Sequence, residues 1–457
     1  MNTPPGYDPT WSVLDDVTER AKRYLRSVGE RRVAPTREAV AGLAQLDVPL
    51  QDRPIRAQKV VEELDRIAEP ATLTISGPRF FGFVNGGSLP ATVAVNWLST
   101  AWDQHGTFAA TSPATTALER IAMRWIIDLL GLPAESVGAF VTGTTVAHIT
   151  ALAAARDWLL SQCGWNIDQR GLFGAPEIDV IAGEEGHPTL FKALGVVGLG
   201  RARLIRVPVD AQGRMRAEPL PRIKAPTIVC LQAGNVNTGS FDPFNAIIDR
   251  VRDADHPTWV HVDGAFGIWA RVAPQRTYLT AGVERADSWA TDGHKWLNVP
   301  YDCGMAIVRN ADALRKTMSF KADYLPEEAA NPSDYTPEGS RRPRGVDAWA
   351  ALRTLGRSGL ADLVERNCRL AKRFADAFVA AGYSVLNDVV LNQVLVSFGE
   401  PERTRKIIAA IQEDGTCWCG PTVWHEQTAM RVSVISWLTT EEDVDLSIET
   451  ILRLARS

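Results

Sequence analysis

Cysteine, net charge and long apolar runs are all scarce in this chain, and each scarcity excludes a class of protein. Only six of the 457 residues are cysteine, too few for a disulfide framework, so a reducing, cytoplasmic location is expected. The formal charge of −5 provides no cationic surface for nucleic acid. No run of about 18 uncharged apolar residues is present to span a membrane, and no signal peptide is expected. We therefore expect a small-molecule ligand and neither a nucleic-acid nor a membrane partner.

The overall composition is that of a folded protein. Hydrophobic residues make up 45% and charged residues 23% of the chain, proportions typical of globular proteins rather than disordered or fibrous ones. At roughly 150 residues per domain, the length predicts two or three units. Cys417 and Cys419 form a C-W-C pair, which has neither the spacing of a redox dithiol nor a second pair to complete a zinc site. No metal centre is expected.

Short apolar runs alternate with helical stretches in the middle of the chain. The runs are IDVIAG (178–183), RLIRVPV (203–209), TIVCLQAG (227–234), TWVHVDG (258–264), DSWATD (287–292) and GMAIVRN (304–310). Several are rich in β-branched residues and bounded by Gly, Pro or Asp, so they predict strands covered on both faces in a mainly parallel α/β sheet. Ligands of such sheets bind beyond the C-terminal ends of the strands.

The flanking regions have other patterns. Apolar residues at three-to-four spacing predict amphipathic helices over residues 11–75. Residues 321–345 hold four prolines and no periodicity, which predicts a long surface loop. Helix, strand, helix, strand and helix follow one another near the C-terminus, which is typical of a smaller α+β domain. We therefore expect an N-terminal helical segment (1–75), a large α/β domain (76–355) and a small C-terminal domain (356–457).

Two charged residues close neighbouring strands of the predicted sheet. Asp263 lies in HVDGAFG and Lys295 lies in DGHKWLNVP, 32 residues further on, about one strand–helix–strand unit. Burial beside the apolar WLNVP would free the lysine amine as a nucleophile toward a carbonyl. An aspartate facing a pyridine nitrogen would keep that nitrogen protonated. Taken alone, the pair is equally consistent with a buried ion pair.

Two further patterns place polar groups where strands lead into helices. In FVTGTTVAHITALAAAR, Thr144 and Thr145 follow Gly143 at the start of a helix, whose free amides suit a phosphate. In EEGHPTLFKALG, His187 stands between a strand and a helix, where an imidazole can stack on a bound aromatic ring. Alone, the threonines are also ordinary helix caps, and the histidine is also a capping or core residue.

Six segments, in a fixed order, carry a family resemblance. They are FFGFVNGGSLPA, ATSPATTALE, TGTTVAHITALAAAR, EEGHPTLFKALG, HVDGAFG and DGHKWLNVPYDCG. Together they resemble the group II pyridoxal-phosphate-dependent decarboxylases, which include the aromatic-L-amino-acid and glutamate decarboxylases. The resemblance implies the fold-type I, aspartate-aminotransferase-like architecture and pyridoxal 5′-phosphate as cofactor. It also implies a homodimer with shared active sites, in which the N-terminal helical segment of each subunit wraps around its partner.

The resemblance also implies roles for single positions. It makes Lys295 the lysine that holds the cofactor, Asp263 the partner of the pyridine nitrogen and His187 the residue stacked on the ring. Tyr335 matches the tyrosine that protonates the substrate's α-carbon after carbon dioxide leaves. These four are the expected catalytic residues. The remaining cofactor-binding positions are Ala265 on the other ring face and Thr144, Thr145, Asp292 and His294 at or near the phosphate. The implied substrate-binding positions are Phe80, Phe81, His105, Thr107 and Arg431, of which His105 and Thr107 match a stretch that reaches the partner's pocket.

Two departures from the family pattern stand close to the expected cofactor. GTTVAH replaces GGTEAN, so Val146 and His148 stand in place of a carboxylate and an amide. Val236 stands where the family has a threonine for the ring hydroxyl. We expect a neighbouring amide, Asn235 or Asn237, to donate the missing hydrogen bond.

The expected reaction is α-decarboxylation of an L-amino acid to its amine and carbon dioxide. Phe80, Phe81 and Phe108 favour an aromatic substrate. One alternative is decarboxylation with oxidative deamination to an aldehyde, which relatives reach when the tyrosine or histidine is altered. Others are decarboxylation of a non-aromatic amino acid, transamination, and a cofactor-binding protein without turnover.

Overall fold

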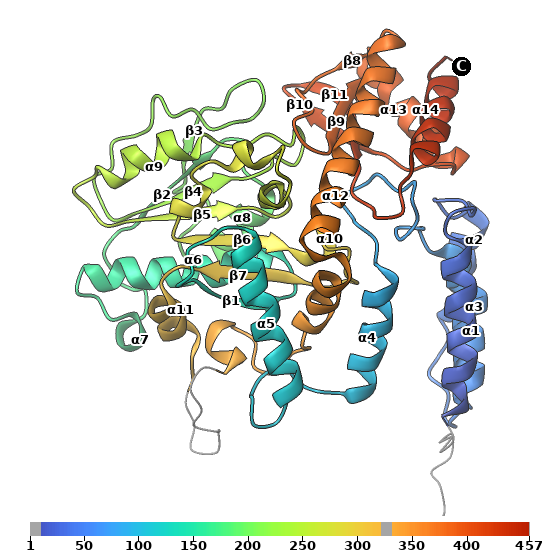
Figure 1. Cartoon of the computed structure of the whole chain (residues 1–457), viewed down its shortest axis with the longest axis horizontal. Coiled ribbons are helices and arrows are strands. Elements are labelled where there is room, and N and C mark those ends of the chain that lie inside the picture. The colour runs from blue at the N-terminus through green and yellow to red at the C-terminus, as the bar shows by residue number, and fades with distance from the viewer. Residues whose placement is uncertain (1–10, 321–330, 457) are drawn as a thin grey trace, which may run out of the picture.

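The chain folds around two β-sheets, one of seven strands and one of four. The computed structural model describes residues 11–320 and 331–456. The seven-stranded sheet lies between layers of helices, and the smaller sheet lies beside it with the C-terminal helices (Figure 1). A pair of long helices near the N-terminus stands apart from both as an arm (Figure 1).

Seven strands form the large sheet. They are β1 (Val137–Val141), β2 (Asp179–Gly183), β3 (Ile205–Val207), β4 (Thr227–Gln232), β5 (Thr258–Asp263), β6 (Ser288–Asp292) and β7 (Gly304–Val308). Their order in the sheet is β1-β7-β6-β5-β4-β2-β3. β7 runs antiparallel to both of its neighbours, and the other neighbouring pairs are parallel. The predicted α/β class with a mainly parallel sheet is confirmed; the reversed direction of β7 was not predicted.

Both faces of this sheet are buried. In β4, Val229 and Leu231 pack into one hydrophobic cluster, whereas Ile228 and Cys230 pack into another. Successive side chains of a strand point to opposite faces, so the two clusters lie on the two sides of the sheet. The helices that contribute to the first cluster are α5 (Pro113–Leu129), α9 (Phe244–Arg252) and α12 (Gly345–Ala380), and those that contribute to the second are α6 (Thr144–Gln162), α8 (Pro188–Val196) and α11 (Ala311–Met318).

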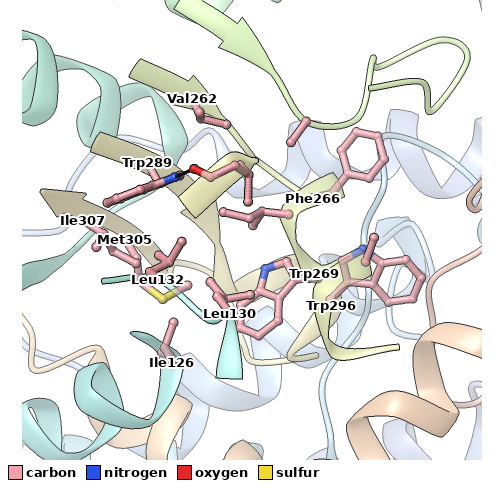
Figure 2. Packing of buried hydrophobic residues seen from close by; sticks show 14 of the residues in the cluster. Ile126, Leu130, Leu132, Val262, Phe266, Trp269, Trp289, Trp296, Met305 and Ile307 are labelled. Carbon is pink, nitrogen blue, oxygen red and sulfur yellow. Dashed lines mark hydrogen bonds between the residues drawn. The ribbon is translucent and has the colours of Figure 1, made fainter. Parts of the chain in front are cut away.

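Tryptophan rings fill the centre of the first cluster. Trp269 and Trp289 are fully buried among aliphatic side chains (Figure 2). Trp289 Nε1 donates to the carbonyl of Val283 at 2.9 Å, and Trp269 Nε1 donates to the hydroxyl of Thr291 at 2.9 Å. A buried indole N–H without an acceptor would be costly, so these bonds fix the rings in place. The cluster thereby supports β5 and β6, which end in charged side chains.

The small sheet is wholly antiparallel. Its strands are β8 (Ser384–Val385), β9 (Gln393–Ser397), β10 (Gly420–Trp424) and β11 (Gln427–Ser433), in the order β10-β11-β9-β8. Helices α13 (Pro401–Asp414) and α14 (Glu441–Arg456) complete this unit. The expected strands β9 and β11 are present. β8 and β10 were not predicted because they are short and only partly buried, and so lack a continuous apolar run.

Helix α12 joins the two units (Figure 1). Its first part packs against α4 (Pro90–Trp102) and α5, and its second part packs against β9 and α14. The helix changes direction at Gly356, whose φ of 61° is a left-handed value. Glycine adopts such values without the steric penalty of a Cβ atom, so this residue permits the bend.

The N-terminal arm presents apolar side chains to its surroundings. It consists of α1 (Ser12–Ser27), α2 (Arg37–Gly42) and α3 (Ala57–Ile67). An ion pair of 2.6 Å between Arg20 and Asp65 joins α1 to α3. No residue of α1 is buried, and Leu14 and Leu64 are 52% and 57% exposed. The apolar stripe predicted from the sequence is therefore only partly covered within the described chain.

Short elements complete the described residues. They are α7 (Ile167–Arg170), α10 (Gly293–Trp296) and the 3₁₀ turns η1 (Leu43–Leu46), η2 (Glu69–Ala71), η3 (Gly267–Val272), η4 (Thr277–Thr280), η5 (Val283–Arg285) and η6 (Pro332–Tyr335). In residues 11–320 and 331–456, no helix has both the length and the apolar character needed to cross a bilayer. Cys417 and Cys419 are buried, unpaired thiols.

Candidate active site

A cavity of about 350 Å³ opens at the C-terminal ends of β4, β5 and β6. Its volume lies in the range of about 300–1,000 Å³ typical of small-molecule sites. Nine residues that the sequence singled out line it: Thr144, Thr145, His187, Asp263, Ala265, Asp292, His294, Lys295 and Arg431. The cavity thus lies where parallel sheets with covered faces bind their ligands.

Lys295 stands on the turn that follows β6. Asp292 ends that strand and α10 begins at the next residue, so the two side chains lie on the same side of one turn. Lys295 Nζ is 2.9 Å from Asp292 Oδ2, and the Thr144 amide donates to Asp292 Oδ1 at 2.7 Å. Burial alone would raise the pKa of Asp292, but the charges of Lys295 and His294 outweigh it and lower that pKa. Asp292 is therefore an ionised carboxylate that holds the lysine amine.

Asp263 ends β5 and is 4% exposed. The Ala265 amide donates to its Oδ1 at 3.1 Å, and His148 Nε2 lies 3.5 Å from its Oδ2. Burial acts to raise the pKa of Asp263, yet His148, His187 and the Ala265 amide together lower it well below its usual range. An ionised carboxylate in the wall of the cavity has the chemistry needed to face a protonated ring nitrogen.

His187 both caps α8 and lines the cavity. Its Nδ1 accepts from the Thr189 amide at 3.3 Å and lies 2.7 Å from the Thr189 hydroxyl. Because Nδ1 accepts a hydrogen bond, the proton of the neutral ring lies on Nε2. Burial lowers the pKa of His187, against the opposing charge of Asp263. The imidazole is therefore neutral near pH 7, with an Nε2–H for a ligand.

The start of α6 forms another wall. The hydroxyl oxygen of Thr144 is buried and has no hydrogen-bond partner among the described residues. The backbone of β7 meets this turn closely, because a Cβ on Gly304 would lie 2.4 Å from the Cα of Gly143. Glycine at both positions lets the two segments meet. Free helix amides with threonine hydroxyls beside them are the chemistry of a phosphate site.

The structure does not place Asn235 in the cavity wall, which corrects the prediction that it donates to the ring hydroxyl. Its Oδ1 accepts from the amides of Asn237 and Thr238. Its Nδ2 donates to the Glu185 carbonyl and to Gln232 Oε1. These four bonds, one of them to the segment that follows β2, use the side chain fully, and Asn237 is likewise outside the cavity wall.

Gln232 was not predicted and does line the cavity. The orientation of its amide follows from Asn235, whose Nδ2 donates to Gln232 Oε1 at 3.1 Å. Gln232 Nε2 is then a donor with no hydrogen-bond partner among the described residues. The sequence gave no signal for this role, because Gln232 is the last residue of the buried strand β4 and not part of the loop that carries Val236.

Phe80 and Phe81 lie in the core and not in the cavity wall, which corrects their predicted substrate role. Phe80 stacks on Trp418 with ring centroids 5.1 Å apart. Phe81 packs edge-on against Phe374, also at 5.1 Å. Their exposed fractions are 2% and 0%. Packing against the C-terminal unit therefore accounts for both rings.

The residues that follow take the expected place of these rings. Phe83, Val84 and Asn85 line the cavity. Phe83 and Val84 have φ values of 52° and 60°, left-handed conformations that are rare for bulky residues. Such strain costs about 1–3 kcal/mol per residue and is concentrated at functional sites. Tyr301 also lines the cavity, and its hydroxyl donates to Asn85 Oδ1.

Three predicted residues lie outside the cavity of their own chain. The Thr107 hydroxyl donates to the Gly339 carbonyl, so His105 and Thr107 lie beside the segment that follows η6. Tyr335 lines a separate cavity of about 320 Å³ beside α5 and β1. None of the three lines the cavity that holds Lys295. Their predicted contribution to a partner's pocket stays a prediction.

Arg431 reaches the cavity from β11. Its guanidinium donates to the Val236 carbonyl at 3.1 Å, and it forms no ion pair within the described residues. Burial lowers the pKa of Arg431 without removing its charge. A cation without a counterion in a cavity is suited to a carboxylate ligand.

This set of groups fits pyridoxal 5′-phosphate. Lys295 offers an amine for the aldehyde, Asp263 an ionised partner for the ring nitrogen, and the start of α6 amides and the unpartnered Thr144 hydroxyl for the phosphate. Among residues 11–320 and 331–456, no cluster of three or more His, Cys, Asp or Glu side chains is arranged to hold a metal ion.

Known proteins share both the sequence pattern and the fold. Tryptophan decarboxylase 1 from Oryza sativa subsp. japonica is 27% identical over 433 residues, which cover 86% of this chain and 83% of that protein. A phenylacetaldehyde synthase from a Rosa hybrid cultivar is 24% identical over 438 residues, which cover 87% and 84% of the two chains. The crystal structure of Oryza sativa TDC with PLP and tryptamine matches with a TM-score of 0.90 at 24% identity, covering 100% of this chain and 99% of that one.

The family assignment depends on the conserved domain. Residues 41–398, most of the chain, match the conserved domain of pyridoxal-dependent decarboxylases. The order of motifs from the start of α6 to Lys295 and the cavity in which they meet agree with that match. The chain therefore belongs to the pyridoxal-dependent decarboxylase family, whose cofactor is pyridoxal 5′-phosphate.

Proposed function

We propose that the protein decarboxylates an aromatic L-amino acid to its amine and carbon dioxide. The observation that carries this proposal is the meeting of Lys295, Asp263 and His187 in one cavity at the ends of the parallel strands. Phe83 and Tyr301 give that cavity aromatic walls. The similarity to a tryptophan decarboxylase supports the same class of substrate.

Each charged group has a proposed role toward the cofactor. Lys295 holds it covalently through Nζ, and Thr144 and Thr145 hold its phosphate at the start of α6. The bound cofactor supplies an electron sink for the pair that is left when carbon dioxide departs. Asp263, ionised, keeps the ring nitrogen protonated. His187, neutral, stacks on the ring without adding a positive charge beside it.

The substrate is oriented by groups on both sides of the cavity. The guanidinium of Arg431 attracts its carboxylate, and His187 Nε2–H donates to the same group. Holding that carboxylate so that its bond to the α-carbon lies perpendicular to the ring selects the bond that breaks; orientation of this kind is worth several kcal/mol in favourable cases. Ala265 leaves room for the opposite face of the ring.

Gln232 is proposed to donate to the ring hydroxyl. The side chain of Val236 has no donor, and the side chain of Asn235 already makes hydrogen bonds with Glu185, Gln232 and its own loop. The Nε2 group of Gln232 lines the cavity wall at the end of β4 and has no other acceptor in the described chain. It can therefore replace the missing threonine.

Tyr335 is proposed to protonate the α-carbon of the substrate in the partner subunit. Burial raises the pKa of Tyr335, so the phenol keeps its proton at neutral pH. The position of Tyr335 outside its own Lys295 cavity supports action across a dimer interface. So do the places of His105 and Thr107, which are proposed to bind substrate in the partner's pocket.

A homodimer is proposed on the same grounds. Leu14 and Leu64 of the arm are exposed, and α1 and α3 stand away from the two sheets (Figure 1). A second copy would bury this apolar surface. We also propose the division of the chain into residues 1–75, 76–355 and 356–457, and a cytoplasmic location, which the unpaired state of all six cysteines supports.

Formation of an aldehyde is the second candidate. The similarity to a phenylacetaldehyde synthase, 24% identical over 438 residues, favours it. The choice between amine and aldehyde depends on whether Tyr335 delivers its proton. Decarboxylation of a non-aromatic amino acid, transamination and cofactor binding without turnover remain as further alternatives.

Product analysis tests the proposal. The cofactor-loaded protein is incubated with each proteinogenic amino acid, dopa, 5-hydroxytryptophan and 2,4-diaminobutyrate, and the products are identified by mass spectrometry. The amine of an aromatic substrate is the expected product. Aldehyde with ammonia and peroxide would support the second candidate, and an amine from non-aromatic substrates alone would contradict the proposed substrate class.

A further inference from the structure

A line of buried, hydrogen-bonded side chains, His148, His261 and Ser288, leads away from Asp263 into the interior of the large sheet. We call this line the file. His148 Nδ1 lies 2.8 Å from Nε2 of His261, and His261 Nδ1 lies 2.8 Å from Oγ of Ser288. Trp259 Nε1 donates to the same Ser288 oxygen at 2.8 Å. The two histidines and the serine are 0% exposed. Each group therefore depends on its neighbours in the file for hydrogen bonds.

The two ends of the file determine the direction of its protons. An indole N–H only donates, so Ser288 accepts from Trp259, whereas an ionised carboxylate only accepts. When both imidazole rings are neutral, only one placement of the protons gives each of the four contacts, from Trp259 through Ser288 and the two histidines to Asp263, a donor and an acceptor. In that arrangement, Ser288 donates to His261, His261 Nε2 donates to His148, and His148 keeps its proton on Nε2. Burial lowers the pKa of His261 to about 3, which keeps that ring neutral.

A positively charged His148 would break this arrangement. Its Nδ1–H would donate to His261, whose own proton would then point at Ser288. Ser288 would accept from both neighbours, and its hydroxyl hydrogen would have no acceptor in the described chain. A buried donor without an acceptor is costly. The hydrogen bonds of the file therefore favour the tautomer of His148 that carries its N–H on Nε2.

That N–H has one group to serve. His148 Nε2 is buried and has no hydrogen-bond partner among the described residues, and Asp263 Oδ2 lies 3.5 Å away. At this distance the contact is mainly electrostatic. The Ala265 amide approaches the other carboxylate oxygen at 3.1 Å. Each of the two carboxylate oxygens of Asp263 therefore has a nitrogen nearby, that of the Ala265 amide or that of His148.

His148 is also one of the departures that the sequence shows from the family pattern, where an amide stands at this position. A side-chain amide always carries N–H groups, so it can donate a hydrogen bond whatever its neighbours are. An imidazole has two nitrogens, and which one carries the proton depends on what the other one contacts. With an imidazole in place of the amide, His261 and Ser288 therefore determine which nitrogen of His148 carries the proton.

We propose that His148 is a positioning residue for the cofactor's ring nitrogen: its Nε2–H faces Asp263 Oδ2 across 3.5 Å, and the file through His261 and Ser288 fixes the tautomer that places the proton there. The inference rests on the proposed role of Asp263 as the partner of that nitrogen. The N–H of His148 and the amide of Ala265 then orient the Asp263 carboxylate from its two oxygens. The ring nitrogen then receives the full attraction of the carboxylate.

The test compares pyridoxal 5′-phosphate with its 1-deaza analogue, in which a C–H group replaces the ring nitrogen. The cofactor-free protein is titrated with each, and the ratio of the two Kd values isolates the interaction between Asp263 and the nitrogen. The wild-type protein is expected to favour the natural cofactor by about tenfold or more. His148→Leu is expected to lower this ratio by about tenfold, through weaker binding of the natural cofactor alone.

Two further variants separate the proton from the packing. His148→Asn restores an amide donor and is expected to keep the ratio within about threefold of wild type. Ser288→Ala removes the donor that fixes the tautomer, so the ratio is expected to fall by about threefold in the wild-type background and not in the His148→Asn background. This pair of measurements stands on its own if His148→Leu does not fold.

The outcomes also separate this inference from the function on which it rests. Equal weakening of both cofactors by His148→Leu, or an unchanged ratio, would overturn the role of His148. A ratio that falls in Asp263→Asn but survives in His148→Leu and in Ser288→Ala would overturn that role while leaving the role of Asp263 intact. A ratio near one in the wild-type protein would overturn both.

Discussion

Lys295 Nζ and Asp292 Oδ2 are 2.9 Å apart, and the other oxygen of the same carboxylate accepts the amide of Thr144 at 2.7 Å. One buried carboxylate therefore connects the lysine to the start of α6. The amine and the phosphate site are held in a fixed relation by a single residue at the end of β6. This relation depends on the fold, because residues 144 and 292 are far apart in the sequence.

The role of Lys295 predicts the fate of a covalent adduct. Reduction of the cofactor-loaded protein with borohydride should attach the cofactor permanently to the peptide that contains Lys295, and Lys295→Ala should abolish that adduct. Peptide mass spectrometry is the measurement, with Lys192→Ala in α8 as the control that keeps the adduct. An adduct that persists on another lysine of the Lys295→Ala protein would refute the assignment.

The role of Gln232 predicts that one substitution weakens cofactor binding and that a second substitution restores it. Gln232→Leu removes the proposed donor to the ring hydroxyl and should weaken cofactor binding by about five- to tenfold, the effect of one hydrogen bond of about 1 kcal/mol or somewhat more. Adding Val236→Thr, which supplies a hydroxyl, should recover most of the affinity. Fluorescence titration of the cofactor-free variants measures both. Unaltered affinity in Gln232→Leu would remove this residue from the site.

The proposed sharing of active sites predicts complementation between two defective subunits. Lys295→Ala inactivates its own site, and Tyr335→Phe inactivates the partner's site for amine formation. A hybrid dimer of the two should contain one intact site, so mixed and re-associated subunits should regain up to about half of the wild-type amine production per hybrid. Each variant alone should give little amine, and Tyr335→Phe alone should shift its product toward aldehyde.

The same mixture offers a clear refutation. If Tyr335 acted within its own chain, both sites of the hybrid would carry a lesion and no activity would return. Light scattering on the wild-type protein supplies the control, since the account requires a dimer at working concentrations. An active monomer would contradict the shared site.

Asp242 predicts a loss of stability as the pH rises. Its two carboxylate oxygens accept the amides of Met215 and Gln232 at 2.7 Å, yet burial outweighs these bonds and raises its pKa to about 7. Because the pKa is about 3.9 in the unfolded chain, folding favours the protonated form. The stabilisation is fully present below about pH 4 and declines by about 1.4 kcal/mol per pH unit up to about pH 7.

Urea denaturation of wild type and Asp242→Asn between pH 4 and pH 8 checks this prediction. The difference in unfolding free energy between the two proteins should change in favour of the variant as the pH rises. Asp253→Asn, at an exposed position, is the control and should follow the wild type. Parallel curves for wild type and Asp242→Asn would show that Asp242 does not titrate in this range.

The sequence predicted the residues that end strands and begin helices better than those that shape the walls of the cavity. Asp263, Asp292 and Lys295 stand at strand ends, where the change from apolar to polar residues is visible in the sequence. Phe80 and Phe83 lie in one short aromatic segment and both stack on Trp418, far away in the chain, yet Phe80 is 2% exposed and Phe83 is 63% exposed. Only the folded backbone decides which ring is buried. The left-handed backbone at Phe83 gave no signal in the sequence.

The fold, like the site, has features that the sequence predicted and features that it did not. Six of the seven strands of the large sheet, β2 to β7, were predicted from apolar runs, because burial on both faces leaves a continuous pattern in all of them except the edge strand β3. The antiparallel direction of β7 was not predicted, since direction depends on the connection and not on the composition of the strand. Gln232 was overlooked because a buried strand residue and a residue that lines a cavity look alike in the sequence. The boundaries at residues 75 and 355 stay predictions.

Decarboxylation in D₂O tests the central claim most directly. The cofactor-loaded protein is given an aromatic L-amino acid such as tryptophan or dopa, and carbon dioxide, amine and the deuterium content of the α-carbon are measured together. The account predicts equal amounts of carbon dioxide and amine, with one deuterium on the α-carbon of the amine. Amino acid that exchanges its α-hydrogen for deuterium without release of carbon dioxide, or no reaction with any aromatic substrate, would contradict it.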